Sequence, residues 1–221
     1  IRFYCKVKQG ATKRIANFVK AEKGSSRNIW ITVDGPYGNQ NPYHHYDKAV
    51  FISSGNGFPG PYPSVKSLMD SSSKTEIKLY WTIPDYSYID CFAEELSILK
   101  RLPFNPVVYV THSNNSFPII DVSESINDSS TNSENESKGS TQVRELSTSN
   151  EIKKYFEYLT FIEGRMDSRQ IVEKELSNAN GTVAFGCCAH ARINDTVRAE
   201  LVKHLKGSDP NFSYFEETQV W

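Results

Sequence analysis

The sequence predicts an α/β fold whose main part is a parallel sheet. From residue 48 onward, strand, loop and helix patterns follow one another repeatedly, which is typical of parallel strands joined by crossover helices. A polar connector at residues 39–47 marks a change of composition and separates this part from a shorter first part. The length of 221 residues is enough for one large domain or two modest ones.

The first part contains strand and helix patterns without such a repeat. Residues 1–8 alternate apolar and polar side chains, which predicts a half-buried strand. Residues 14–19 predict a short helix, and residues 28–33 predict a second strand that stops at an Asp-Gly-Pro-Tyr-Gly turn, residues 34–38. Because the chain begins without Met and already inside an alternating pattern, we expect it to be the C-terminal part of a longer protein.

In the second part, each predicted element is bounded by Gly, Pro or polar residues. Residues 122–149 interrupt the pattern with Ser, Asn and Glu, which can bury almost nothing, so we predict a disordered insertion in a surface loop. A regulatory phosphorylation tract is the alternative to a plain spacer, and order resumes at residues 152–161. The predicted strands are 49–53, 76–83, 106–111, 181–186 and 212–221, and the predicted helices are 62–69, 88–99, 168–176 and 195–205.

Composition and charge exclude several classes of function. The formal net charge is −1, so the surface as a whole attracts neither nucleic acid nor an anionic membrane. No window approaches the roughly 18 apolar residues that a membrane-spanning helix needs. The four cysteines include no C-x-x-C pair, which argues against a metal site or a disulfide framework and favours reduced thiols. We therefore expect no bound metal here, and a partner that is recognised at one specific site.

The stretch 55–60, Gly-Asn-Gly-Phe-Pro-Gly, matches G-x-G-x-x-G and lies between a predicted strand and a predicted helix. In that context glycines let a diphosphate approach the backbone, and the first turn of the helix offers free N–H groups and a positive dipole end. Pro59 has no N–H and departs from the usual Rossmann loop. Taken alone, the motif has two interpretations, a tight surface turn or a dinucleotide-binding loop.

Several further motifs occur in a defined order along the chain. They are Gly10-Ala11-Thr12, Asp34-Gly35-Pro36-Tyr37-Gly38, the glycine loop, Trp81-Thr82-Ile83-Pro84-Asp85, Gly164-Arg165, residues 188–198 and the ending Tyr-Phe-Glu-Glu-Thr-Gln-Val-Trp. In this order they resemble the cytoplasmic flavin and nicotinamide region of fungal ferric- and cupric-chelate reductases. These enzymes are relatives of the NADPH oxidases within the ferredoxin-NADP reductase superfamily. The resemblance covers the whole chain apart from the insertion.

The resemblance implies a fold, a domain order and a set of cofactors. Residues 1–40 would be the C-terminal remnant of an antiparallel β-barrel that binds FAD, and residues 41–47 would be the linker. Residues 48–221 would form a Rossmann-like NADP-binding domain that carries the insertion at 122–149. The cofactors are then FAD and NADPH, with heme in membrane helices that this sequence does not contain.

The resemblance also implies roles for residues near both ends of the chain. Gly10 and Thr12 would receive the flavin diphosphate at the start of the short helix, with an ordinary helix cap as the alternative. Gly35 and Pro36 would form the hinge between barrel and nucleotide domain, or merely a turn. Trp221 would cover the flavin ring until nicotinamide displaces it, because an indole offers a large flat face for stacking. A frayed terminal Trp is the alternative.

Other residues are implied to bind the nicotinamide nucleotide and to take part in catalysis. Gly55, Gly57 and Gly60 would cradle its diphosphate. Cys188 resembles the cysteine of the family's C-G-P motif. That cysteine lies beside the nicotinamide, where hydride leaves C4 for flavin N5.

The residues around this cysteine motif and the choice of nucleotide depart from the family pattern. Ala189 and His190 replace the Gly and Pro of the motif. His190 would contact a phosphate, with a structural role as the alternative. Arg165 is the candidate cation for the 2′-phosphate of NADPH, because Pro84 stands where related oxidases carry Arg.

The implied function is delivery of hydride from NADPH to FAD at the cytoplasmic face of a membrane, the plasma membrane being the expected one. The flavin would pass single electrons through heme to ferric or cupric chelates outside, because a two-electron donor must be matched to one-electron acceptors. The partners are thus the nicotinamide nucleotide, the protein's own membrane heme domain and the chelates, without nucleic acid. Two alternatives remain, an NADPH oxidase that makes superoxide and a non-catalytic interaction module that uses the Ser/Asn/Glu tract.

Overall fold

The computed structural model divides the chain into two compact units, Ile1–Gln40 and Asn41–Trp221. No helix in the described part of either unit is long and apolar enough to span a membrane. The residues that the structure describes are 5, 7–21, 26–35, 41–71, 73–112, 149–205 and 211–217.

The described residues of the first unit form one helix, α1, Ala11–Lys20, which begins three residues earlier than predicted. Neither of the two strands predicted for this unit is present among the residues that the structure describes. Cys5, Val7 and Lys8 have no regular structure, and neither do residues 28–33, where Trp30 is fully exposed. A strand exists through hydrogen bonds to a neighbouring strand, and among the described residues nothing pairs with these two stretches. The assignment of this unit to an FAD-binding barrel stays a prediction.

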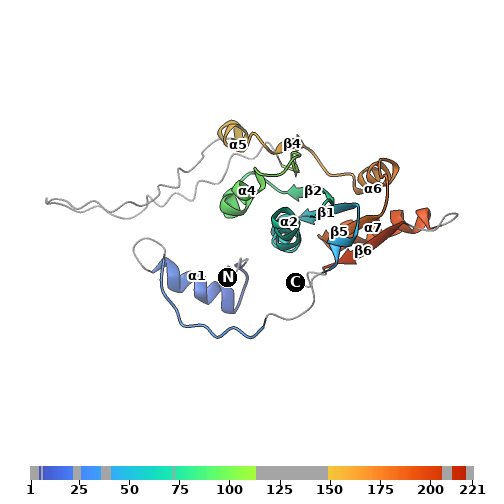
Figure 1. Ribbon diagram of the computed structural model, residues 1–221. Coiled ribbons are helices and arrows are strands. Elements are labelled where there is room, and N and C mark those ends of the chain that lie inside the picture. Colours follow the sequence, from blue (N-terminus) through green and yellow to red (C-terminus); the bar gives the residue numbers. More distant parts are fainter. Residues whose placement is uncertain are drawn as a thin grey trace. The chain divides into compact units, whose positions relative to one another are not determined.

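The second unit is built on a six-stranded sheet with the order β4-β3-β2-β1-β5-β6 (Figure 1). Every neighbouring pair is parallel, which confirms the predicted α/β class. The order reverses at β1, so the carboxyl ends of β1 and β5 meet at the position where open α/β sheets bind ligands. The strands are β1 Lys48–Ser54, β2 Glu76–Ile83, β3 Val107–Val110, β4 Thr160–Glu163, β5 Val183–Cys188 and β6 Phe212–Glu216.

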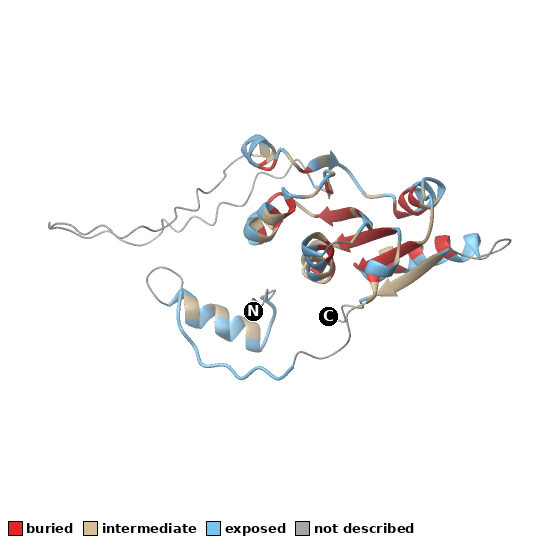
Figure 2. Ribbon diagram, in the orientation of Figure 1, coloured by how far each residue is buried: buried red, intermediate tan, exposed pale blue. Residues whose placement is uncertain are grey.

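Helices pack on both faces of the sheet, as right-handed crossovers on either side of β1 require (Figure 1). On one face, Val172 and Val197 from two of the helices pack against Val50, Ile52 and Phe185 of the central strands. The central strands are accordingly the most deeply buried elements of the unit (Figure 2). The helices are α2 Pro61–Asp70, α3 Ser87–Cys91, α4 Ala93–Leu99, α5 Ser149–Tyr155, α6 Ser168–Ser177 and α7 Ala191–His204, with 3-10 turns at Tyr43–His45 and Gly55–Gly57.

Several element boundaries differ from the prediction for reasons of packing. The helix predicted at 88–99 is split at Phe92, whose buried ring lies 5.1 Å from that of Phe58. Residues 152–161, which carried no predicted type, contain the end of α5, a turn at 156–159 and the start of the edge strand β4. The predicted insertion lies outside the described residues except for Ser149, the first residue of α5.

Two more boundaries matter for the site. β5 continues to Cys188, two residues past its predicted end, because residues up to Cys188 pair with β1 as far as Ser53. α7 begins at Ala191 rather than at residue 195. A short turn therefore joins β5 to α7, and the first residues of α7 come close to the sheet.

The amino end of the sheet is closed by paired charges. Lys48 and Glu175 are 4% and 2% exposed, and Lys48 Nζ lies 3.2 Å from Glu175 Oε2. The hydroxyl of Tyr80 donates to Glu175 Oε1 at 2.6 Å. Nearby, the carboxylate of Asp47 accepts hydrogen bonds from the backbone N–H and the hydroxyl of Thr182 at 2.8 and 2.9 Å. Lys48, Glu175 and Asp47 therefore each have a partner within the unit.

Candidate functional site

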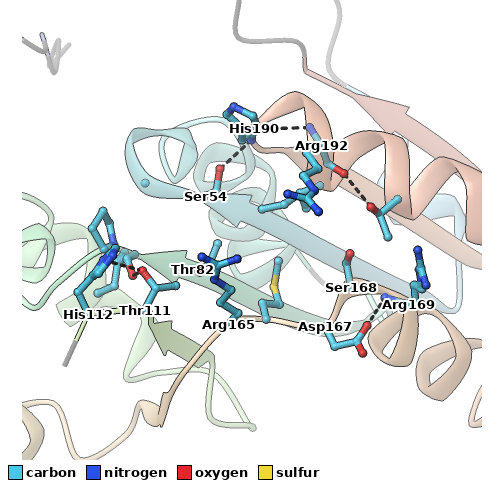
Figure 3. A pocket seen from close by; sticks show the side chains of 16 residues that line it. Ser54, Thr82, Thr111, His112, Arg165, Asp167, Ser168, Arg169, His190 and Arg192 are labelled. Atoms are coloured by element: carbon cyan, nitrogen blue, oxygen red, sulfur yellow. Dashed lines mark hydrogen bonds between the residues drawn. The ribbon is translucent and has the colours of Figure 1, made fainter. Parts of the chain in front are cut away.

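A pocket of about 810 Å³ opens at the carboxyl end of the sheet (Figure 3). Its walls come from the residues that end or follow β1, β2, β3, β4 and β5, and from the first turns of α6 and α7. Ser54, Thr82 and Thr111 contribute short polar side chains to it, and Met166 and Ile193 contribute apolar ones. The mixture of apolar wall and convergent polar groups is typical of a small-molecule site.

The pocket is strongly cationic. Arg165, Arg169 and Arg192 line it together with two histidines, His112 and His190. Within the part of the chain that the structure describes, none of these three guanidinium groups pairs with a carboxylate. Arginine is always charged and fits phosphate oxygens through two parallel N–H groups. The arrangement therefore fits a ligand that carries phosphate.

Two of these arginines occupy the same position on two helices. Arg169 is the second residue of α6, and Arg192 is the second residue of α7. Neither helix has an acidic residue in its first turn, although Asp167 caps α6 by accepting from the N–H groups of Arg169 and Gln170. A cation in the first turn faces the positive end of the helix dipole, which costs stability unless an anion binds there.

The glycine loop forms a rigid shelf at the end of β1. Gly55 has a φ of 49°, a left-handed conformation that favours glycine, and its carbonyl accepts from the indole N–H of Trp81 at 2.9 Å. The ring of Trp81 in turn packs 4.8 Å from the ring of Phe58, inside the loop. Gly57 is buried. The loop is thus held from beneath by aromatic side chains, while Gly55 faces the pocket.

Gly60 brings the glycine loop against the predicted cysteine. A Cβ at Gly60 would lie 2.6 Å from Cys188 Sγ and 2.5 Å from Glu217 Oε2, so no larger residue fits without movement. The thiol and the carboxyl therefore flank the same point and are no more than about 5 Å apart. Burial raises the pKa of Glu217. Close packing against Cys188 accounts for the third glycine of the motif in this structure.

His190 joins the end of β5 to the loop after β1. Its backbone N–H donates to Ser54 Oγ at 2.8 Å, and its Nδ1 accepts from the backbone N–H of Arg192 at 3.3 Å as the cap of α7. When Nδ1 accepts, the neutral ring carries its proton on Nε2. His190 therefore has a structural role, the capping of α7, which was the alternative to phosphate binding. Its ring also lines the pocket.

The adjacent cysteines point to opposite faces of the sheet, as neighbouring strand residues do. Cys187 belongs to the core beneath α7, where its thiol donates to Asn194 Oδ1 at 3.0 Å. Burial raises the pKa of the Cys187 thiol to about 12, so it stays protonated and inert. Cys188 is buried on the other face, beneath the glycine loop. Among the described residues, no group of three or more His, Cys, Asp or Glu side chains is arranged to hold a metal.

The structure brings some predicted site residues together and separates others. Gly55, Arg165 and His190 line one pocket, whereas Gly57 and Gly60 do not line it and Cys188 lies against Gly60 beneath the loop. Sequence reasoning missed three of the pocket's basic residues. The signal available for two of them was an arginine in the first turn of a helix that follows a strand, with no acidic residue in that turn. The missed residues are His112, Arg169 and Arg192.

The remaining predicted residues belong to the first unit or lie outside the described residues. Gly10 has a φ of 90° and precedes α1, where no side chain caps the first N–H groups. The hydroxyl of Thr12 donates to the carbonyl of Lys8 at 3.1 Å and accepts from its N–H at 2.9 Å. Gly35 has a φ of 129°. Pro36 and Trp221 lie outside the described residues.

Comparison with known families identifies the second unit. The model of the family described as "Ferric reductase NAD binding domain" matches residues 46–202, which include every strand of the sheet except β6. The chain belongs to this family. The pocket with its unpaired arginines lies within the matched region, at the edge of the sheet where such a domain binds its nucleotide.

The chain is similar along its whole length to curated proteins of two yeasts. It is 32% identical over 222 residues to a Candida albicans "Probable ferric reductase transmembrane component", covering 100% of this chain and 33% of that protein. The identity is 32% to "Ferric/cupric reductase transmembrane component 1" of Candida albicans, with 100% of this chain and 29% of the relative covered. The identity to "Ferric reductase transmembrane component 3" of Saccharomyces cerevisiae is 28%, with 98% of this chain and 30% of the relative covered. The chain thus spans about a third of the length of these relatives.

Proposed function

We propose that this chain is the part of a membrane-bound ferric or cupric reductase that accepts hydride from NADPH on FAD at the cytoplasmic face of the plasma membrane. Electrons would then leave through heme in the membrane part of the protein and reduce ferric or cupric chelates outside. The family match and the names of the relatives support the reductase activity. The observation that carries the nucleotide site is the pocket at the carboxyl end of the sheet, lined by three arginines without carboxylate partners in the described structure.

In this proposal the nucleotide lies across the carboxyl ends of the strands. Gly55 faces its diphosphate, because it lines the pocket at the end of β1 and carries no side chain of its own. Arg165 binds the 2′-phosphate of the adenosine ribose, and His112 beside it adds a ring N–H. Pro84, at the end of β2, contributes no charge to this part of the pocket.

FAD would supply the step from a two-electron donor to one-electron acceptors. The first unit fits its diphosphate, because α1 begins at Gly10 without a side-chain cap and without an acidic first turn. Thr12 holds the start of α1 through Lys8, and Gly35 and Pro36 form the hinge between the two units. Cys188 takes the position beside the nicotinamide, where it is fixed by contact with the glycine loop. Trp221 would cover the flavin ring until nicotinamide displaces it.

The test is a titration of the 221-residue chain with NADPH and NADH by calorimetry, followed by assays of the full-length protein in membranes. We expect saturable NADPH binding, and NADPH-dependent reduction of ferric and cupric chelates that superoxide dismutase does not suppress. Suppression by superoxide dismutase would instead support the NADPH oxidase. A folded chain that binds neither nucleotide, and a full-length protein that reduces no chelate, would overturn the proposal in favour of the interaction module.

A further inference from the structure

The arginines of the pocket divide into two groups by position. Arg165 follows β4, whereas Arg169 and Arg192 are the second residues of α6 and α7. These two helix-start arginines also line a groove of about 470 Å³ between α6 and α7, which includes no residue of the glycine loop. Figure 3 shows the side chain of Arg192 extending from α7 and that of Arg169 extending from α6, with the Ser168 hydroxyl between them in this view.

Both helix-start arginines are placed where an anion would stabilise them. Each residue lies in the first turn, at the positive end of its own helix, and neither guanidinium pairs with a carboxylate of the described chain. Asp167 also lines the pocket, but its Oδ1 accepts from the backbone N–H groups of Arg169 and Gln170, and it forms no ion pair with either guanidinium among the described residues. The backbone at Arg192 is fixed, because Thr196 donates to its carbonyl at 2.8 Å and His190 accepts from its N–H. The backbone that carries Arg192 is therefore held in place before any ligand arrives, while the side chains of both arginines are exposed to solvent.

The position of this pair indicates which phosphate it binds. In the proposed site the diphosphate lies at Gly55, on the β1 side of the pocket, whereas the helix-start arginines approach from α6 and α7. NADPH differs from NADH by one phosphate on the adenosine ribose, away from the diphosphate. The loop after β2 offers Pro84, which has neither charge nor N–H, so it cannot hold that phosphate.

We propose that Arg169 and Arg192, with the hydroxyl of Ser168, form a clamp that holds the 2′-phosphate together with Arg165 and selects NADPH over NADH. This inference rests on the proposed nucleotide site. It assigns the choice of nucleotide to the starts of α6 and α7 rather than to the loop after β2. NADPH and 2′,5′-ADP both carry the 2′-phosphate, so the clamp should bind both ligands.

The experiment measures Kd for four probes, NADPH, NADH, 2′,5′-ADP and 5′-ADP, on the 221-residue chain and its Arg169→Ala and Arg192→Ala variants. Each lost guanidinium–phosphate contact should weaken NADPH and 2′,5′-ADP by roughly 10- to 100-fold. NADH and 5′-ADP should change by less than about threefold, since they make no such contact. The matched control is Arg101→Ala, because Arg101 is exposed, pairs with Asp70 and does not line the pocket. Arg192→Lys should restore part of the loss, since it returns the charge without the fork.

The outcomes separate this inference from the proposed function. An equal loss for all four probes would place the arginines on the diphosphate and overturn the clamp, while leaving the nucleotide site intact. Unchanged affinities in both variants would also overturn the clamp alone. If the folded wild-type chain binds none of the four probes, the proposed function fails and the clamp fails with it. Circular dichroism of each variant checks folding, and Arg169→Gln and Arg192→Gln replace any alanine variant that does not fold.

Discussion

The two ends of the same parallel sheet treat charge in opposite ways. At the amino end, Lys48 and Glu175 are buried as a pair and Asp47 is satisfied by Thr182. At the carboxyl end, Arg165 and the two helix-start arginines line an open pocket without a described carboxylate partner. The charges at the amino end are therefore paired within the unit. The charges at the carboxyl end are available to pair with a ligand.

The largest effect is expected at the closed end. Glu175→Ala leaves the ammonium group of Lys48 buried without its closest partner, which should lower the free energy of unfolding by about 3–5 kcal/mol. Chemical denaturation followed by circular dichroism measures this change. The double variant Lys48→Met/Glu175→Leu should recover most of the loss, because an apolar pair removes both buried charges. A single variant as stable as the wild type would break the contrast between the two ends.

The open end should respond to the reverse test. Arg165→Ala should change the free energy of unfolding by no more than about 0.5 kcal/mol, because the side chain is exposed and unpaired among the described residues. Binding of NADPH should weaken by about 1.5–3 kcal/mol, the cost of one hydrogen-bonded charge. Denaturation and calorimetry on the same sample separate the two effects. A variant that unfolds easily would mean that Arg165 serves the fold.

Gly60 tests the packing of the glycine loop on Cys188. Gly60→Ala places a Cβ within 2.6 Å of Cys188 Sγ, and the resulting strain should cost about 1–3 kcal/mol of stability. In the double variant Gly60→Ala/Cys188→Ala the sulfur is absent, so part of the loss should return. Thermal unfolding of both variants and of Cys188→Ala gives the coupling between the two positions. Simple additivity would contradict the contact.

The smallest effect is a pH dependence at the closed end. The hydrogen bonds from the backbone N–H and hydroxyl of Thr182 lower the pKa of Asp47 from its ordinary value of 3.8. A lowered folded-state pKa stabilises the protein above the unfolded-state value, and this contribution disappears as the pH falls through the folded-state value. The difference in stability between the wild type and Asp47→Asn should therefore be constant near neutral pH and shrink below about pH 4. A difference that grows in acid would contradict the assignment.

The fold of the second unit could be predicted because it follows from local patterns. β1 and β5 are apolar runs followed by loops and helices, and such repeats admit few arrangements other than a parallel sheet. The strand predicted at residues 28–33 failed, since an apolar pattern says nothing of whether a partner strand is present to share its hydrogen bonds.

The site was predictable only where a motif describes the backbone. Gly55 was found through its loop, and Arg165 through a family resemblance. Arg169 and Arg192 lie more than twenty residues apart in helices whose surface residues read as solvated faces, and only the crossover of α6 and α7 brings them to one pocket. Convergence of this kind depends on the order of the strands, which a single sequence does not state.

Because neighbouring residues of β5 point to opposite faces of the sheet, Cys187 and Cys188 report on two different local opening motions. Cys187 and Cys188 are both buried, but one sulfur lies beneath α7 and the other beneath the glycine loop, so different parts of the unit must open before a thiol reagent reaches each. Cys5 and Cys91 are exposed and mark the rate without protection. The labelling rate of Cys188 therefore measures how often the glycine loop separates from the sheet. The labelling rate of Cys187 measures how often α7 separates from it.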